Sequence, residues 1–244
     1  MNATPLSDPD PVLDLRLLAE APHRLLFFVG ATNVLLAVGW WTLWLAAARW
    51  RWFEMPQPAV YAGWMHAVVM QYQVLPAFVF GFLLTVFPRW LGQPALSRRY
   101  YVPVGLGLLL GQLATLAGMT LLPTMLVPGL VLTALGWGTG LAILLSVLWR
   151  AQRLDAHALS AALALLMGLA GLVLAIAFAL GAPPTMMFAA IKFGGFALLL
   201  PLFFTVCHRM LPFFTQCGFK DYRVVRPTWA LIALWLLSLS HLVL

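Results

Sequence analysis

Seven apolar stretches, each close to the length of about 20 residues that a membrane-spanning helix needs, run along the 244-residue chain. They cover residues 25–48, 64–87, 102–122, 126–149, 157–181, 188–207 and 228–244. Sixty-three per cent of the residues are hydrophobic and nine per cent are charged, which is more apolar surface than a water-soluble domain could bury. The sequence predicts an all-α fold, a polytopic bundle of about seven transmembrane helices in a lipid bilayer.

The residues before the first apolar stretch are polar. Residues 1–20 carry four acidic side chains and no apolar core, so we expect a first span that is retained and no cleaved secretory signal. The sequence therefore predicts a cytoplasmic N-terminal tail at residues 1–24 and one transmembrane helical domain at residues 25–244.

Basic residues are distributed unevenly between the two ends of the predicted bundle. The tail and the second, fourth and sixth breaks hold eleven of them: Arg16, Arg24, Arg89, Arg98, Arg99, Arg150, Arg153, Arg209, Lys220, Arg223 and Arg226. The opposite end holds only Arg49 and Arg51. Because cytoplasmic loops are rich in Lys and Arg, this asymmetry predicts a cytoplasmic N-terminus and an external C-terminus. The net charge of +7 therefore reflects topology, and we expect no nucleic-acid partner.

His66 lies near the outer end of the second predicted span, where an unpaired imidazole is costly. Met70 and Gln73 follow at helical spacing, which predicts that the three side chains share one face. His241 and Lys192 lie at a similar depth in the seventh and sixth spans. The two histidines could be axial ligands of a haem or part of a copper site, and Lys192 could meet a haem propionate or another anion. Alternatively, the histidines hydrogen-bond to backbone and Lys192 extends to the headgroups.

A second cluster, on the predicted cytoplasmic side, contains His208 and Arg209 with Cys207 and Cys217 on either side. Cys and His side chains bind metals, but the paired spacing of a zinc site is absent, so a turn beside the membrane is the alternative. A cytoplasmic position predicts reduced thiols and no disulfide.

Two further histidines lie at span ends. His23 precedes the first span and could reach a haem edge from the cytoplasmic face, whereas His157 is expected to be a solvated helix start. The motifs of serine hydrolases, P-loop proteins and HExxH metalloproteases are absent from the sequence. Acidic residues are also absent from the spans, which weighs against a proton-coupled carrier.

Two segments carry a family resemblance. Residues 81–92 read GFLLTVFPRWLG and residues 209–215 read RMLPFFT. They resemble the patterns G-F-L-L-T-A-V-P-N-W-T-G and R-V-I-P-F-F-T of the NnrS family, bacterial inner-membrane proteins that contain haem and copper and are linked to denitrification and nitric oxide stress. Residues 22–28, PHRLLFF, are similar to the family's early P-F-R-P-F-F segment.

The same alignment places His66 and Met70 on the first His and the Met of the family's W-H-A-H-E-M pattern. The family's second His and its Glu correspond here to Val68 and Val69. Family members commonly have about twelve spans, so the resemblance implies a short, seven-span relative.

The resemblance implies a haem b protein of the bacterial inner (cytoplasmic) membrane, with copper as a second possible cofactor and with His66 as the first ligand. Its role would be to handle, sense or detoxify nitric oxide, or to support a respiratory metalloenzyme. A second copy or another membrane subunit could supply a missing wall of the site. The alternatives are a cofactor-free subunit or assembly factor of a respiratory complex, and a small-molecule channel or carrier. Whether a reaction is catalysed stays open.

Overall fold

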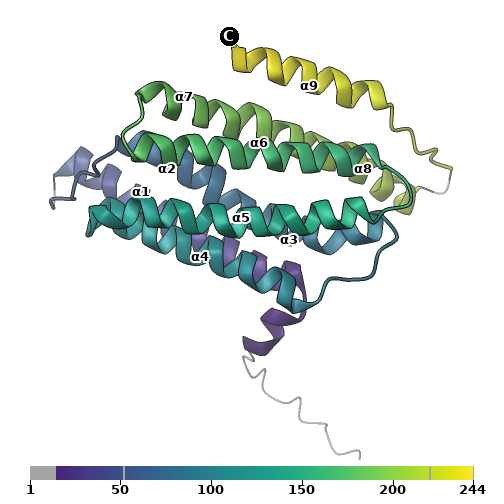
Figure 1. The fold of residues 1–244 in the computed structure, drawn as a ribbon, viewed down its shortest axis with the longest axis horizontal. Helices are drawn as coiled ribbons and strands as arrows, with labels where there is room; N and C mark the ends of the chain where they lie inside the picture. Colours follow the sequence, from purple (N-terminus) through teal and green to yellow (C-terminus); the bar gives the residue numbers. More distant parts are fainter. Residues whose placement is uncertain (1–14, 52, 220, 244) are drawn as a thin grey trace, which may run out of the picture.

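The computed structural model describes residues 15–51, 53–219 and 221–243, and every regular element in these residues is helical (Figure 1). In chain order the elements are η1 (Leu15–Glu20), α1 (Pro22–Trp50), α2 (Ala62–Val69), η2 (Met70–Val74), α3 (Leu75–Trp90), α4 (Arg98–Thr120), η3 (Pro123–Met125), α5 (Leu126–Trp149), α6 (Ala156–Ala179), α7 (Pro184–Lys192), η4 (Phe193–Leu199), α8 (Leu200–Gly218) and α9 (Thr228–Val243). The elements η1 and η3 are 3₁₀ helices, and η2 and η4 are π-helices.

Six continuous helices in the described residues are long and apolar enough to cross a membrane. They are Pro22–Trp50, Ala62–Trp90, Arg98–Thr120, Pro123–Trp149, Ala156–Ala179 and Pro184–Gly218. The seventh, α9, is apolar but has only 16 residues. The predicted polytopic helical bundle is therefore confirmed. The N-terminal orientation stays a prediction, and most of the predicted tail, residues 1–14, lies outside the described residues.

Proline does not end two helices where the sequence suggested a break. The helix through Pro88 continues to Trp90, and α8 runs through Pro212 to Gly218. A proline removes one N–H donor and crowds one carbonyl, and a membrane helix tolerates both effects when neighbouring groups compensate. The segment after His208 is therefore helical, and the predicted turn beside the membrane is wrong.

Two other prolines lie just after the π-helical segments. Pro76 follows η2 by two residues and Pro201 follows η4 by two residues. A proline ring clashes with the carbonyl four residues earlier, here that of Tyr72 or Ala197, and a π-helical turn relieves such a clash by moving the carbonyl away. The sequence therefore contains a local cause for both π segments.

The closest helix pair is α4 and α5, which pack through glycines. A Cβ built on Gly107 would lie 2.6 Å from the Cα of Gly136, and one built on Gly136 would lie 2.9 Å from the Cα of Gly107. On the same interface, a Cβ on Gly111 would meet Thr133. The close backbone contact that the sequence predicts for these helices is confirmed, in the manner common for membrane helices.

A fully buried polar network joins the first four spans. Gln73 Nε2 donates to the hydroxyls of Thr115 and Thr133 at 2.8 and 2.9 Å. Asn33 Nδ2 donates to the Gln73 carbonyl at 3.0 Å, and Gln112 Nε2 donates to the Asn33 carbonyl at 2.7 Å. These side chains occupy the centre of the bundle with 0% exposure, so the network fixes how α1, η2, α4 and α5 meet.

The last helix, α9, forms the outermost layer, as Figure 1 shows in yellow. It contacts η4 and α8, and Trp235 Nε1 donates to Ser160 Oγ of α6 at 2.9 Å. Ser160 Oγ also lies 2.7 Å from Thr205 Oγ1 of α8. These hydrogen bonds place α9 against the outside of the α6–α8 pair.

Candidate functional site

The ring of His66 lies flat against an indole of α1. Its centroid is 4.4 Å from that of Trp41 with an angle of 11° between the planes, and Trp41 stacks in turn on Trp44 at 5.3 Å and 3°. The imidazole is half-buried and belongs to the last turn of α2. This stack fixes the plane of the imidazole while its nitrogens remain at the ring edge.

Three buried nitrogens around this stack lack hydrogen-bond partners among the described residues. They are His66 Nδ1, Trp40 Nε1 and Trp44 Nε1. A neutral imidazole nitrogen accepts a hydrogen bond or binds a metal, whereas an indole N–H only donates. The backbone hydrogen bond that the alternative interpretation of His66 required is thus missing at Nδ1. Sequence reasoning overlooked the tryptophans, although the run WWTLW at residues 40–44 was the available signal.

The other two predicted outer residues lie at η4. Lys192 directly precedes η4 and lines a small pocket of about 250 Å³ with Phe188 and Leu242. His241 is exposed, and its ring centroid lies 4.0 Å from that of Phe196 in η4. The structure therefore brings Lys192 and the end of α9 to one place. Within the described residues no contact joins His241 to His66, so their pairing as axial ligands stays a prediction.

The first π segment, η2, hydrogen-bonds to the end of α7, directly before η4. Tyr72 of η2 donates its hydroxyl to the Ala190 carbonyl, and Gln71 Nε2 donates to the Ile191 carbonyl at 3.3 Å. Gly194 gives Gln71 and Tyr72 the space for this approach, because a Cβ there would lie 2.2 Å from Gln71 Oε1. These two side chains therefore join the second span to the sixth at the start of η4.

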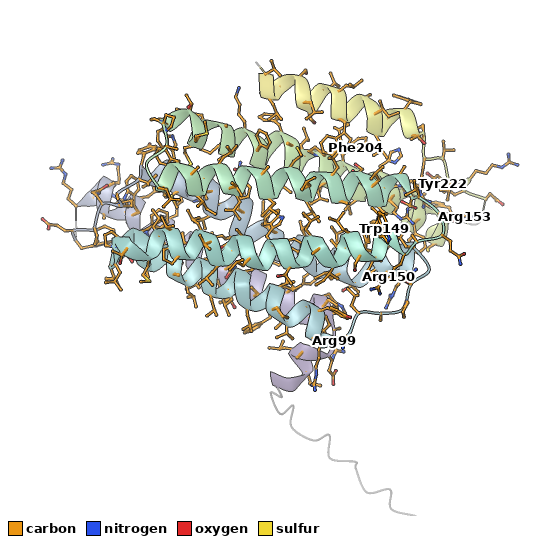
Figure 2. The ribbon with its side chains drawn as sticks, in the orientation of Figure 1. Arg99, Trp149, Arg150, Arg153, Phe204 and Tyr222 are labelled. Atoms are coloured by element: carbon orange, nitrogen blue, oxygen red, sulfur yellow. The ribbon has the colours of Figure 1, made fainter. Side chains whose placement is uncertain are left out.

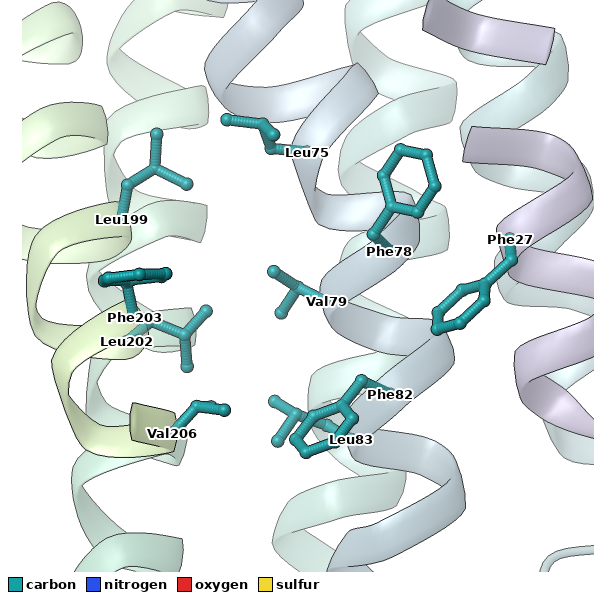
Figure 3. Close-up of a pocket in the computed structure, with 10 residues that line it drawn as sticks. All are labelled: Phe27, Leu75, Phe78, Val79, Phe82, Leu83, Leu199, Leu202, Phe203 and Val206. Atoms are coloured by element: carbon teal, nitrogen blue, oxygen red, sulfur yellow. The ribbon is translucent and has the colours of Figure 1, made fainter. Parts of the chain in front are cut away.

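An apolar groove of about 460 Å³ lies between α3 and α8, with Phe27 of α1 at its side (Figure 3). All ten lining side chains are apolar: Phe27, Leu75, Phe78, Val79, Phe82, Leu83, Leu199, Leu202, Phe203 and Val206. His23 lies one turn before Phe27, with its ring 6.2 Å from that of Phe27 and Nδ1 3.4 Å from Thr85 Oγ1. The groove offers apolar contact, and His23 is a predicted ligand whose ring faces Phe27 of its lining.

At the predicted cytoplasmic end, two histidines meet. His157 Nε2 lies 2.9 Å from His208 Nδ1, and the two rings stack 5.2 Å apart. His157 is only 8% exposed, so its expected role as a solvated helix start is wrong. Its partner lies 51 residues away in sequence, a proximity that local pattern could not reveal.

Asp155 and Arg209 complete this cluster. Asp155 caps α6 by accepting hydrogen bonds from the N–H groups of His157 and Ala158, and its other oxygen pairs with Arg209 at 2.6 Å. The Arg209 guanidinium also lies 4.4 Å above the ring of Trp90. Partial burial would raise the pKa of Asp155, but hydrogen bonds from His157 and Ala158 together with Arg209 hold that pKa well below its usual range.

The predicted cofactor residues His208 and Arg209 therefore contact protein groups. Of the side-chain nitrogens of His208 and Arg209, only His208 Nε2 is buried without a hydrogen-bond partner in the described residues. Cys207 and Cys217 are free, as a reduced pair requires. Within residues 15–51, 53–219 and 221–243, no group of three or more His, Cys, Asp or Glu side chains could hold a metal ion.

No curated protein and no solved structure matches this chain. A family model does match: that of the NnrS protein, over residues 17–244, which is nearly the whole chain. It includes the segments at residues 81–92 and 209–215, which form the end of α3 and part of α8. With its multi-pass helical bundle, the chain belongs to the NnrS family.

Proposed function

We propose that this chain is a haem b protein of the bacterial inner membrane that acts in the nitric oxide response, with His66 as the axial ligand. The observation that carries the proposal is the buried Nδ1 of His66, which has no hydrogen-bond partner among the described residues. Stacking on Trp41 holds the ring in one plane, as a ligand requires. The family match supports the nitric oxide response.

The donor set favours haem over a mononuclear copper site. A copper site built from His and Cys side chains needs several of them around one ion, and the described residues offer no group of three or more His, Cys, Asp or Glu side chains. Haem iron needs only one or two protein ligands, because the porphyrin supplies the rest. A single histidine such as His66 is therefore sufficient for haem.

The chain's own residues would hold the cofactor as follows. His66 would supply a nitrogen ligand, and the indole N–H groups of Trp40 and Trp44 are donors without partners beside it. His241 and Lys192 lie at η4, where His241 would be a second ligand and Lys192 the partner of a propionate. Haem would supply an iron that binds a diatomic gas such as nitric oxide when the position opposite His66 is open or weakly held.

A visible spectrum of the protein purified in mild detergent tests the proposal. We expect a reduced-minus-oxidised haem band in the wild type and its loss in His66→Ala. His157→Ala is the matched control, because this buried histidine lies at the predicted cytoplasmic end and its loss should leave the band in place. A well-folded, iron-replete preparation without a haem band would contradict the proposal. A haem band that survives in His66→Ala would show that His66 is not the ligand.

One observation favours a cofactor-free subunit or assembly factor as the second candidate. Val68 and Val69, where the family pattern has its second His and its Glu, are 0% and 1% exposed and belong to the apolar core. That part of α2 therefore serves packing. Co-purification of a respiratory complex with a haem-free chain would favour this candidate. A channel or carrier has less support, because no acidic side chain lies inside the described spans, and uptake into proteoliposomes is its test.

A further inference from the structure

A polar pocket of about 570 Å³ lies at the predicted cytoplasmic end of the bundle, away from His66. Its walls are the α3–α4 loop, with Gly92 and Gln93, and the α5–α6 loop, with Arg150 and Arg153. Gln93 Nε2 donates to the Arg150 carbonyl at 3.2 Å, which ties the two loops together. A hydrogen bond between its two loops therefore holds the pocket in shape, and its volume is in the range of ligand sites.

The free charge in this pocket is positive. Arg150 and Arg153 are exposed, and within the described residues neither forms an ion pair. The acidic lining residue, Asp155, is already neutralised by Arg209 at 2.6 Å. Two guanidinium groups therefore remain without a counter-charge. Guanidinium groups bind phosphate oxygens through paired N–H donors, so this charge fits a phosphate group.

Neutral groups in the pocket also suit an anion. Gln152 and Gln93 contribute side-chain amides to the lining. Gly92 adopts a left-handed conformation with φ of +66°, and a Cβ there would meet no atom within 4 Å. The loop therefore presents bare backbone to open space at this point, and a bulky headgroup can approach it closely.

The rim of the pocket identifies the source of that phosphate. Trp149, the last residue of α5, is 91% exposed and directly precedes Arg150. Leu154, which lines the pocket, is 81% exposed and directly follows Arg153. Figure 2 shows Trp149, Arg150 and Arg153 at one end of the bundle. Exposed tryptophan next to arginine is typical of the membrane interface, where headgroups lie. A soluble anion would gain nothing from the two apolar side chains.

We propose that this pocket binds the phosphate headgroup of an anionic membrane lipid, with Arg150 and Arg153 on the phosphate and Trp149 and Leu154 in the adjoining acyl layer. The two loops that form the site connect α3 to α4 and α5 to α6. Bound lipid therefore links these two helix pairs at this end.

Lipid binding to the full chain in detergent micelles tests the proposal, with phosphatidylglycerol as the anionic probe and phosphatidylcholine as the neutral one. We expect phosphatidylglycerol to bind the wild type more tightly by about tenfold or more, because each basic residue near the surface contributes to the attraction. The variant Arg150→Gln/Arg153→Gln should lose that preference. Arg98→Gln/Arg99→Gln is the control, because it removes the same charge from exposed residues outside the pocket.

The possible outcomes separate a defined site from diffuse attraction. Equal loss of affinity in both double variants would overturn the proposal. Glycerol phosphate that binds the wild type as tightly as the lipid would also overturn it, because the site would then take a soluble phosphate. This second measurement needs no variant, so a misfolded Arg150→Gln/Arg153→Gln protein would not leave the proposal undecided.

Discussion

The facing nitrogens of His157 and His208 lie 2.9 Å apart and join the first turn of α6 to α8. Asp155 extends this contact, because it caps α6 and binds Arg209 one residue after His208. The contact of Arg209 with Trp90 then connects the end of α3. The family-like segment at residues 209–215 begins with Arg209. This residue of α8 therefore connects α8 to α6 and α3.

Asp155→Asn should destabilise the protein at neutral pH by about 1–3 kcal/mol, because the Arg209 charge would lose its partner. The folded-state pKa of Asp155 is lowered, so its contribution to stability is fully present above the unfolded pKa of about 4 and is lost as the pH falls through the lower folded pKa. Thermal unfolding in detergent should show wild type and variant converging as the pH drops below about 4. A constant gap between them would contradict the assignment.

Gly136→Ala should destabilise the bundle by about 1–3 kcal/mol, since the new methyl group would collide with Gly107 and push α4 from α5. Gly138→Ala, two residues along the same helix, is the matched control, because a Cβ there meets nothing within 4 Å. We expect the control to match or exceed the wild type in melting temperature, since alanine favours helix. Equal destabilisation by both would refute the tight contact.

Gln73→Glu tests the buried polar network. An ionised carboxylate would face the Thr115 and Thr133 hydroxyls, which already donate to backbone carbonyls, so neither proton is free to bind it. Burial disfavours the charged form, so the variant should lose stability as the pH rises from 5 to about 8. Gln73→Leu should cost little, on the order of 1 kcal/mol, at every pH, because hydrogen bonds between membrane helices contribute modestly. Melting curves across pH that are parallel for the two variants would argue against this network.

Trp41→Leu tests the proposed haem ligand through its neighbour. Removing the stacked indole frees the His66 ring to rotate, and loss of such an orienting contact typically weakens metal binding by about tenfold or more. The haem-to-protein ratio and the position of the reduced band should both change. Trp149→Leu, at the exposed end of α5, should alter neither. If the two variants share one spectrum with the wild type, Trp41 does not position a ligand.

The helical bundle and its glycine contacts were predictable, because apolar length and small residues are local signals. The burial of His157 was not predictable, because it depends on His208, which lies far away in sequence. The end of α8 was misjudged because Pro212 is an ambiguous signal in a membrane helix.

The candidate site was predictable only in part. His66 was recognised as a costly polar residue, and its unpartnered nitrogen agrees with that view. The side chains around His66 could not be predicted from the sequence. They depend on the face that α1 turns toward α2, and packing over the whole bundle decides that face. The stack on Trp41 follows from that packing.

The π turn at Met70–Val74 has a consequence for comparing this chain with its relatives. It holds one more residue than a regular turn, so every side chain beyond it is rotated by about 100° relative to an uninterrupted α-helix. The sequence rule that places His66, Met70 and Gln73 on one face assumes an uninterrupted helix. A relative that lacks one residue here and has an uninterrupted helix would align after a single gap and present the same side of its second span to the core, because the π turn absorbs the extra residue. A relative of equal length without the π turn would present a side rotated by about 100°. The presence or absence of the π turn therefore decides what the second span of a relative faces.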